Sequence, residues 1–136
     1  MRTVVAKFGG TSLASAEQFR KVRQIVMADA DRRLIVASAP GKRCAEDVKV
    51  TDLLLSCYEH AVAGQDFEAD LRAVSARFDE IIRALELDFP LEAELEALRN
   101  HLQAGPQRDY VLSRGEYLNA RLLAAWLGYT FVDPEW

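Results

Sequence analysis

The sequence has few cysteines and histidines, and these residues form no recognisable pattern. Among 136 residues there are two cysteines, Cys44 and Cys57, and two histidines, His60 and His101. The cysteines are not at metal-ligand spacing, and a short secreted chain held by disulfides would need more of them. We therefore expect no metal site and no nucleophilic triad, with Cys44 as a loop thiol, Cys57 as a core thiol and a reduced, cytoplasmic setting.

The sequence also has no excess of basic residues and no long apolar run. The 17 Lys and Arg residues are outnumbered by 21 Asp and Glu residues, so the formal net charge is -4 at pH 7. This balance provides no basic surface for nucleic acid or an anionic membrane. No apolar run approaches the roughly 20 residues of a membrane span, and no apolar leader with a cleavage site is visible. We expect neither a nucleic-acid nor a membrane partner.

Two common nucleotide-binding motifs are missing as well. The chain has no G-x-x-x-x-G-K-[ST] loop and no G-x-G-x-x-G fingerprint. It also has no internal repeat, no low-complexity segment and no linker that would divide it. Half of the residues are hydrophobic, which is enough for a sizeable core in a chain of ordinary domain length. We therefore expect a single folded unit.

The first 40 residues have the pattern of a β-strand, an α-helix and a second β-strand. Residues 3–8 are β-branched and apolar and stop at two glycines, which predicts a buried strand followed by a loop. The segment SAEQ at residues 15–18 fits a capping box and predicts a helix over residues 15–28. Residues 33–39 form a continuous apolar run, typical of a strand buried on both faces. We expect a right-handed βαβ unit.

Three further helices are indicated by apolar residues at helical spacing. The first follows Val50 and ends before Gly64, the second covers residues 66–87, and the third begins at Pro90 and ends at Gly105. The second and third are expected to pair as a helical hairpin. Their Glu and Arg residues should lie on a solvated outer face, and we assign no chemistry to them.

The C-terminal part of the sequence predicts one more helix and one more strand. Ser113 is followed three residues later by Glu116, and apolar residues at helical spacing continue to Leu127. Gly128 is suited to the C-terminal turn of this helix. Residues 129–132 are then expected to form a third strand.

The segment from Lys7 to Gly10 has the composition of an anion site. Gly9 and Gly10 follow a strand and let the backbone approach a ligand closely. Free N–H groups of such a loop and of the helix start favour an anion, and Lys7 adds a mobile positive charge. Phosphoryl transfer needs this combination, because its catalysis is mostly positioning and charge neutralisation. The alternative is a tight turn beside a surface lysine, and the pattern alone leaves both open.

Glu116 and Thr51 each have two possible roles. Ser113 and Glu116 form a capping box that any helix start can show. Glu116 can equally be a carboxylate kept ionised by the helix dipole, where it would bind the ammonium group of a substrate. Thr51 is either a helix cap or a hydroxyl that contacts a ligand. The sequence does not separate these alternatives.

Taken together, the segments resemble the aspartokinase branch of the amino-acid kinase family. They occur in the family's order from one end of the chain to the other. The resemblance rests on residues 7–12 (KFGGTS), 38–43 (SAPGKR), 49–54 (KVTDLL), Ser113, Gly115, Glu116, Tyr129, Val132 and Asp133. It implies an α/β fold, a three-layer α/β/α arrangement with a mainly parallel sheet, incomplete and with a helical hairpin insertion. Residues 1–136 would be the N-terminal, substrate- and phosphate-binding part of a kinase domain.

The resemblance also implies an activity and a set of site residues. The activity is transfer of the γ-phosphoryl group of ATP, with Mg²⁺ bound to the nucleotide, to the side-chain carboxylate of L-aspartate. This is the entry step to lysine, threonine and methionine synthesis. Thr51 and Glu116 would contact aspartate, Glu116 through its α-amino group. Phosphate oxygens would be held by Lys7, the catalytic residue, and by its neighbours Phe8, Gly9, Gly10 and Ser12.

The chain also departs from the family pattern. The family's kinase domain is about twice this length, and its second half carries the arginine for the aspartate α-carboxylate, a second phosphate loop and most of the nucleoside site. Regulatory ACT domains are absent from this sequence too. We therefore expect this chain alone to be inactive, as a fragment of the enzyme. The alternative is a non-catalytic module that binds an amino acid or anion, or that self-associates as a homo-oligomer.

Overall fold

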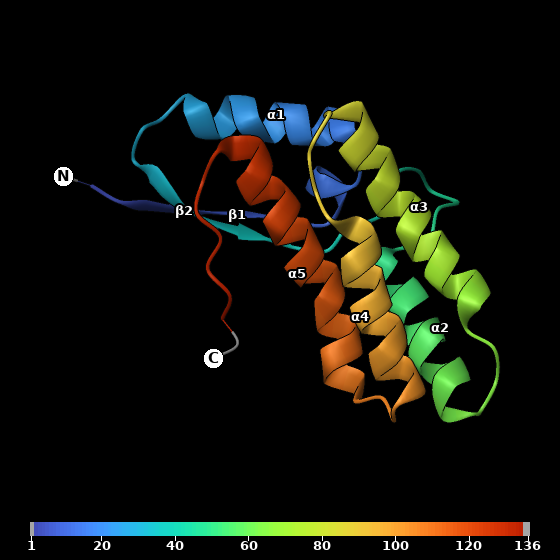
Figure 1. Ribbon diagram of the computed structural model, residues 1–136. Coiled ribbons are helices and arrows are strands. Elements are labelled where there is room, and N and C mark those ends of the chain that lie inside the picture. The colour runs from blue at the N-terminus through green and yellow to red at the C-terminus, as the bar shows by residue number, and fades with distance from the viewer. Residues whose placement is uncertain (1, 135–136) are drawn as a thin grey trace.

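The computed structural model describes residues 2–134 and contains a two-stranded parallel sheet joined by a helix (Figure 1). Strand β1 is Val4–Phe8 and β2 is Arg32–Ala37. Between them lie a short 3-10 helix, η1 (Thr11–Leu13), and helix α1 (Ala16–Met27). The predicted βαβ unit is confirmed.

The start of α1 follows from the predicted cap. Ser15 has extended backbone angles at the N-cap, and its hydroxyl accepts a hydrogen bond from the backbone N–H of Gln18 at 3.4 Å. One of the unpaired N–H groups of the first turn is thereby satisfied. The helix then buries Phe19, Val22 and Val26 against the core.

The two faces of the sheet differ in their surroundings. Phe8, Ile35 and Ala37 lie on the face that packs against the core. The side chains of the opposite face are 46–59 % exposed: Val5, Leu34 and Val36. The expectation that the second strand is buried on both faces is therefore wrong within residues 2–134, where helices cover one face only.

Four longer helices form a bundle beside the sheet (Figure 1). They are α2 (Val50–Val62), α3 (Glu68–Ala84), α4 (Leu91–Gln103) and α5 (Arg108–Leu127). As predicted, α3 and α4 form an antiparallel hairpin, although α3 is two to three residues shorter at each end than its sequence pattern indicates. None of the helices within residues 2–134 is both long and apolar enough to cross a membrane.

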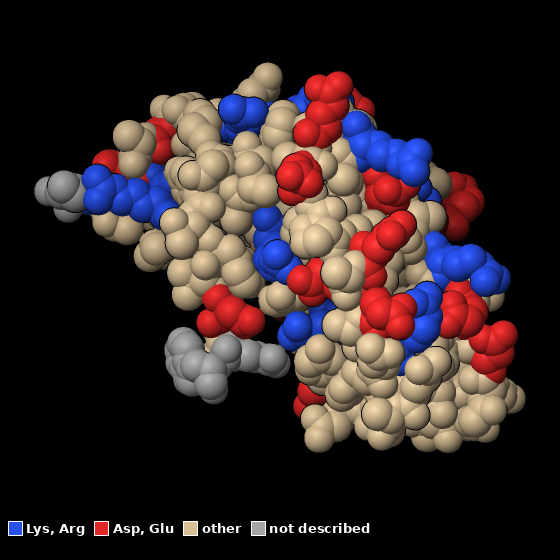
Figure 2. All heavy atoms as spheres, viewed as in Figure 1, with Lys and Arg blue, Asp and Glu red and all other residues tan. Residues whose placement is uncertain are grey.

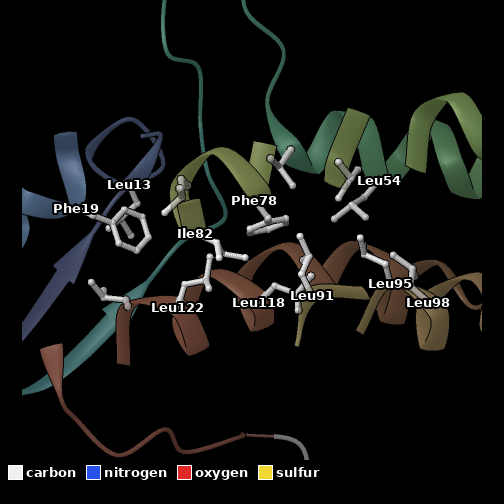
Figure 3. Packing of buried hydrophobic residues seen from close by; sticks show 14 of the residues in the cluster. Leu13, Phe19, Leu54, Phe78, Ile82, Leu91, Leu95, Leu98, Leu118 and Leu122 are labelled. Atoms are coloured by element: carbon white, nitrogen blue, oxygen red, sulfur yellow. The ribbon is translucent and has the colours of Figure 1, made fainter. Parts of the chain in front are cut away.

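A continuous hydrophobic core joins the sheet to the bundle (Figure 3). Leu13 and Phe19 contribute from the sheet side, and Leu54, Phe78 and Leu98 contribute from α2, α3 and α4. All five side chains are at most 2 % exposed. The helices that carry no proposed site residue thus hold in place the ones that do.

The two thiols differ in accessibility, as predicted, and so should their reactivity. Cys44 is exposed and Cys57 is fully buried, and burial raises the pKa of the Cys57 thiol to about 12. Only the thiolate reacts with a disulfide reagent. At pH 8 we expect one fast equivalent of thiol in the native protein and a second only after unfolding. A Cys44→Ser variant should lose the fast phase, and two fast equivalents in the native protein would contradict the burial of Cys57.

The third strand predicted over residues 129–132 does not form. This segment follows α5 in an extended course and is not hydrogen-bonded into the sheet. A strand requires a backbone ladder with a neighbour. Here the segment is held by side chains instead: the Tyr129 hydroxyl donates to the carbonyl of Arg32 at 3.0 Å, and Phe131 packs edge-on against Tyr117.

The last helix begins five residues earlier than predicted. Its first residue is Arg108, so Ser113 lies inside α5 and does not cap it. The Ser113 hydroxyl donates to the carbonyl of Tyr110 at 2.7 Å, a bond that a helical serine can make with the preceding turn. The capping-box interpretation of Ser113 and Glu116 is therefore wrong. Glu116 also lies more than two turns from the start of α5, and the effect of the helix dipole falls off within the first turn.

Candidate functional site

The loops that follow β1 and β2 cross in direct contact at two glycines. The N–H of Gly41 donates to the carbonyl of Gly10 at 2.8 Å. A Cβ atom on Gly41 would lie 2.6 Å from the carbonyl carbon of Gly10 and 2.8 Å from the nitrogen of Thr11. No side chain fits there unless the backbone moves. Gly41 is thus required by the space between the two loops.

The start of α2 is fixed to the same end of the sheet. The N–H of Val50 donates to the carbonyl of Pro40 at 3.1 Å, next to the glycine crossing. The N-cap of α2 is Lys49, and Thr51 is the second residue of the helix and is exposed. The interpretation of Thr51 as the cap is therefore wrong, and a ligand contact remains the hypothesis for its hydroxyl.

Helix α5 meets this region through a third glycine. A Cβ atom on Gly115 would lie 2.9 Å from Cβ of Ala39 and 3.2 Å from Cδ1 of Leu54. The absence of a side chain therefore lets α5 pack directly on the loop after β2 and on α2. Glu116, the next residue, is exposed beside this contact.

Asn119, one turn further along α5, fastens the helix to the end of β2. Its side chain is fully buried, and its Nδ2 donates to the carbonyl of Ser38 at 2.7 Å. An amide in this place supplies a donor to a carbonyl that lies just beyond the sheet ladder. This hydrogen bond is a second contact between α5, which carries Glu116, and the end of β2.

A cavity of about 370 Å³ lies between β2, α5 and the segment that follows α5. Glu116 lines it together with Arg114, whose guanidinium lies over the rings of Tyr110 and Tyr117 at 4.4 and 4.2 Å from their centroids. Val36 lines the cavity from the sheet side. It combines apolar walls with charged groups of both signs, which suits a small zwitterion.

The predicted phosphate-binding residues occupy the open side of the sheet and the turn beyond it. Lys7 is exposed on β1, and its backbone is paired in register with Val36 of the cavity wall. Gly9 and Ser12 are exposed in the turn and in η1. Phe8, in contrast, directs its side chain into the core, so only its backbone could contact a ligand.

The structure thus brings three of the predicted segments to one end of the sheet. Gly10, Thr51 and Glu116 belong to segments that touch each other through Gly41, Pro40 and Gly115. Lys7 lies on the exposed face of β1, and no hydrogen bond or ion pair joins its side chain to Glu116 or Thr51. Figure 2 shows basic and acidic side chains interspersed on one face of the molecule, in line with the near balance of charge in the sequence.

An α/β fold with glycine-lined loops at the carboxyl ends of parallel strands is typical of enzymes that bind small anionic substrates there. The sequence profile of the amino acid kinase family matches residues 2–135, and the chain belongs to this family. It is 40 % identical to aspartokinase 3 of Bacillus subtilis over 141 residues, and 32 % identical to an aspartokinase of Chlamydia pneumoniae over 129 residues. These matches cover 97 % and 92 % of this chain but 30 % and 27 % of the relatives.

Solved structures agree with this assignment. The chain superposes on an aspartate kinase from Clostridium acetobutylicum with a TM-score of 0.94 and 43 % identity, over 98 % of this chain and 31 % of that one. It also matches aspartokinase III of Escherichia coli in complex with aspartate and ADP, with a TM-score of 0.71 and 29 % identity, over 93 % of this chain and 29 % of that one. The predicted α/β fold with a parallel sheet and the resemblance to aspartokinases are confirmed. The chain spans about 30 % of the length of the curated relative from Bacillus subtilis.

Proposed function

We propose that this chain is the substrate- and phosphate-binding part of an aspartate kinase, which transfers the γ-phosphoryl group of ATP to the side-chain carboxylate of L-aspartate. The observation that carries the proposal is the convergence of the Gly10 turn, the first turn of α2 and Glu116 at one end of the sheet through Gly41 and Gly115. The complex of the Escherichia coli relative with aspartate and ADP supports aspartate and an adenine nucleotide as the ligands.

The proposed reaction requires neutralisation of charge more than proton transfer. A free aspartate side chain has a pKa of about 3.9, so the attacking oxygen is already ionised at neutral pH and needs no general base. A bond forms between this oxygen and the γ-phosphorus, the bond from that phosphorus to the bridging oxygen breaks, and ADP leaves with the electron pair. The main obstacle is repulsion between the carboxylate and the phosphates, and fixed positive groups reduce it.

In this scheme the β1–η1 turn is the phosphate side of the site. Lys7 supplies a positive charge, and the backbone of Phe8, Gly9 and Gly10 with the Ser12 hydroxyl supplies hydrogen-bond donors. The exposure of Lys7 and Gly9 leaves both accessible to a nucleotide. Because the side chain of Phe8, the last residue of β1, packs against the core, it fixes the position at which the turn begins.

The aspartate side of the site consists of Thr51 and Glu116. Both are exposed, and their neighbours Val50 and Gly115 lie 3.6 Å apart, measured from Cγ1 of Val50 to the Cβ position of Gly115. The Glu116 carboxylate lines the cavity described above, where it can accept hydrogen bonds from an α-ammonium group. We propose Thr51 as a hydroxyl contact to the same amino acid.

Mg²⁺ enters the proposal as the ion bound to the ATP phosphates, where it offsets their negative charge. Within residues 2–134 no three His, Cys, Asp or Glu side chains gather into a group that could hold a metal ion. We therefore assign the ion no ligand from this chain.

Acceptor specificity tests the proposal. In a chimera, this chain replaces the matching 31 % of the Clostridium acetobutylicum aspartate kinase. We expect ADP release that depends on L-aspartate and is absent with glutamate or carbamate as acceptor. Release with another acceptor but not with aspartate would overturn the proposal. The same assay on the 136-residue protein alone separates turnover from a binding module, because only turnover releases ADP.

Replacement of Glu116 by glutamine should weaken aspartate binding more than it slows the reaction. The amide keeps the shape of the side chain but loses the charge that pairs with the α-ammonium group. We expect the KM for aspartate in the chimera to rise about 10- to 100-fold, with a smaller change in kcat. Because Glu116 is exposed and caps no helix, the melting temperature should not change. An unchanged KM would remove Glu116 from the site.

A further inference from the structure

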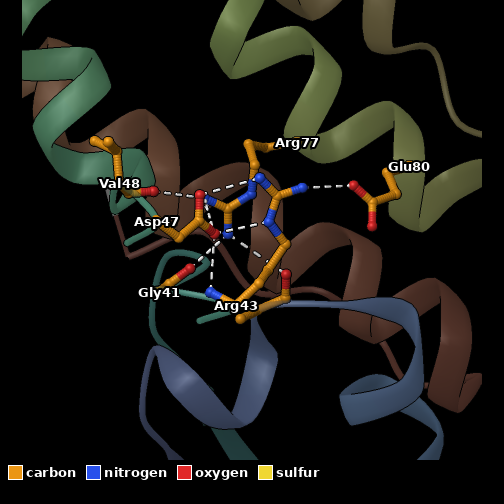
Figure 4. A network of polar contacts seen from close by, with 7 residues as sticks. Gly41, Arg43, Asp47, Val48, Arg77 and Glu80 are labelled. Carbon is orange, nitrogen blue, oxygen red and sulfur yellow. Dashed lines mark hydrogen bonds and ion pairs between the residues drawn. The ribbon is translucent and has the colours of Figure 1, made fainter. Parts of the chain in front are cut away.

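Arg77 of α3 contacts the loop that joins β2 to α2 (Figure 4). The residue is buried, with only 4 % of its surface exposed. Its Nη1 donates to the carbonyl of Val48 at 2.6 Å, and its Nη2 donates to the carbonyl of Gly41 and, at 3.4 Å, to that of Ala14. One guanidinium group therefore binds the backbone on both sides of the glycine crossing. The expectation that the arginines of the hairpin lie on its outer face is wrong for this residue.

Arg77 belongs to a series of side chains with alternating charge. Its Nη1 lies 3.5 Å from the carboxylate of Asp47. Arg43 binds the same carboxylate through Nε at 2.7 Å and Nη2 at 3.0 Å, and its Nη1 reaches Glu80 on α3 at 2.7 Å. The charges of the two arginines and the two carboxylates offset each other. The first and last residues of this series, Arg77 and Glu80, both lie on α3. The hydrogen bond from Arg43 holds the pKa of Asp47 well below its usual range, so Asp47 stays ionised beside Arg77.

The carbonyl groups that Arg77 binds belong to irregular backbone. Such groups have no partner in a helix or a sheet, and they need a donor when they are buried. Gly41 is buried, its N–H is bound to Gly10, and the neighbouring carbonyl of Pro40 is bound to Val50 at the start of α2. The position of Gly41 therefore sets both the phosphate-binding turn and the helix that carries Thr51.

We propose that Arg77 is a positioning residue of the kinase site. By binding the carbonyl groups of Gly41, Val48 and Ala14, it fixes the distance between the β1–η1 turn and the first turn of α2 without contacting either substrate. This inference rests on the proposed function for its effect on catalysis. The structural part of it, that Arg77 locks the loop between β2 and α2, can be tested independently.

Amide hydrogen exchange on the whole 136-residue protein tests the lock. Lysine keeps the charge of Arg77 but cannot donate to three carbonyl groups in this planar arrangement. In Arg77→Lys we expect exchange at the amides of Gly41 and Val50 to quicken at least tenfold relative to that at Leu98 in the core of α4. Arg83 lies on the same helix with its side chain 80 % exposed, and Arg83→Lys is the matched control that should change nothing. An equal change at all amides would show that Arg77 only stabilises the fold, and would overturn the proposal.

A second variant covers the case in which Arg77→Lys does not fold. Asp47→Asn keeps the shape of its side chain and removes the charge that faces Arg77. It should also quicken exchange at Gly41 and Val50 selectively, by a smaller factor than Arg77→Lys. Unchanged exchange at both amides in this variant would contradict the lock.

The catalytic part is measured in the chimera. Arg77→Lys should lower kcat at least tenfold while the KM for aspartate changes less than threefold, because a small displacement of the reacting groups affects the reaction more than binding. Selective loosening of the loop with an unchanged kcat would overturn the positioning role. If the unmodified chimera transfers no phosphoryl group to aspartate, the proposed function fails, while the exchange experiment still decides whether Arg77 holds the loop.

Discussion

Replacement of Lys7 by alanine is expected to lower kcat of the chimera with aspartate by about 10²- to 10³-fold, the usual cost of removing one group that stabilises charge in a transition state. Lys7 is the positive side chain of the turn that we assign to the phosphates. Because the charge develops during transfer, the loss should appear in kcat more than in the KM for aspartate. Steady-state kinetics with ATP and aspartate varied in turn gives both quantities.

The same variant should fold as well as the unmodified protein. Lys7 is exposed on β1, so its removal leaves no cavity and no unpaired buried group. Lys21→Ala on α1 is the matched control, since Lys21 is also an exposed lysine and forms an ion pair with Glu17 in the preceding turn. A Lys7→Ala chimera with the kcat of the Lys21→Ala chimera would exclude Lys7 from catalysis.

Replacement of Gly41 by valine should strongly destabilise the fold of this chain. Its Cβ would lie 2.6 Å from a backbone carbon of Gly10, and backbone atoms cannot rotate out of the way as a flexible side chain can. Overpacking in well-packed regions costs about 1–3 kcal/mol and occasionally more, and this site combines a backbone clash with the loss of a hydrogen bond. We expect a decrease of at least about 3 kcal/mol in the free energy of unfolding, measured by urea denaturation.

Gly9 provides a control directly next to Gly10, the other half of the crossing. A Cβ atom on Gly9 meets nothing within 4 Å. Gly9→Ala should therefore change the free energy of unfolding by no more than about 0.5 kcal/mol. Equal stability losses in Gly9→Ala and Gly41→Val would mean that the close approach of the two loops does not contribute to the fold.

The parts of the fold that depend on local signals were predictable from the sequence. The Ser15 cap, the apolar spacing of the helices and Gly128 with its positive φ each act within one or two turns of the chain. The strands and their parallel connection follow because a β-strand, a helix and a second β-strand permit few other arrangements. The candidate site residues were identified by the order of their motifs, since each motif alone has a purely structural explanation.

The errors arose where the outcome depends on distant neighbours. Residues 129–132 have the composition of a strand, but a strand forms only when another strand pairs with it. Ser113 and Glu116 have the spacing of a cap, but Arg108 begins the helix earlier, and Gly115 is kept inside it by the fit against Ala39. Exposure of one sheet face also cannot be read from the apolar run at residues 33–39.

The burial of Arg77 has a signal in the sequence, namely its place among the apolar residues of α3. Arg77 occurs three residues after Val74 and four residues before Ile81, both of which belong to the buried stripe of α3. A charged residue within such a stripe must be paired, because an isolated buried charge is costly. Its partners could not have been identified, since they come from loops 29 to 63 residues away in the sequence.

The formation of aspartyl phosphate tests the central claim most directly. The chimera is incubated with ATP, Mg²⁺ and L-aspartate in the presence of hydroxylamine, which traps an acyl phosphate as its hydroxamate. Our account predicts aspartyl hydroxamate in amounts equal to the ADP released, and its loss in the Lys7→Ala chimera. ADP release without hydroxamate, or hydroxamate formation that persists when Lys7 and Glu116 are both replaced, would contradict it.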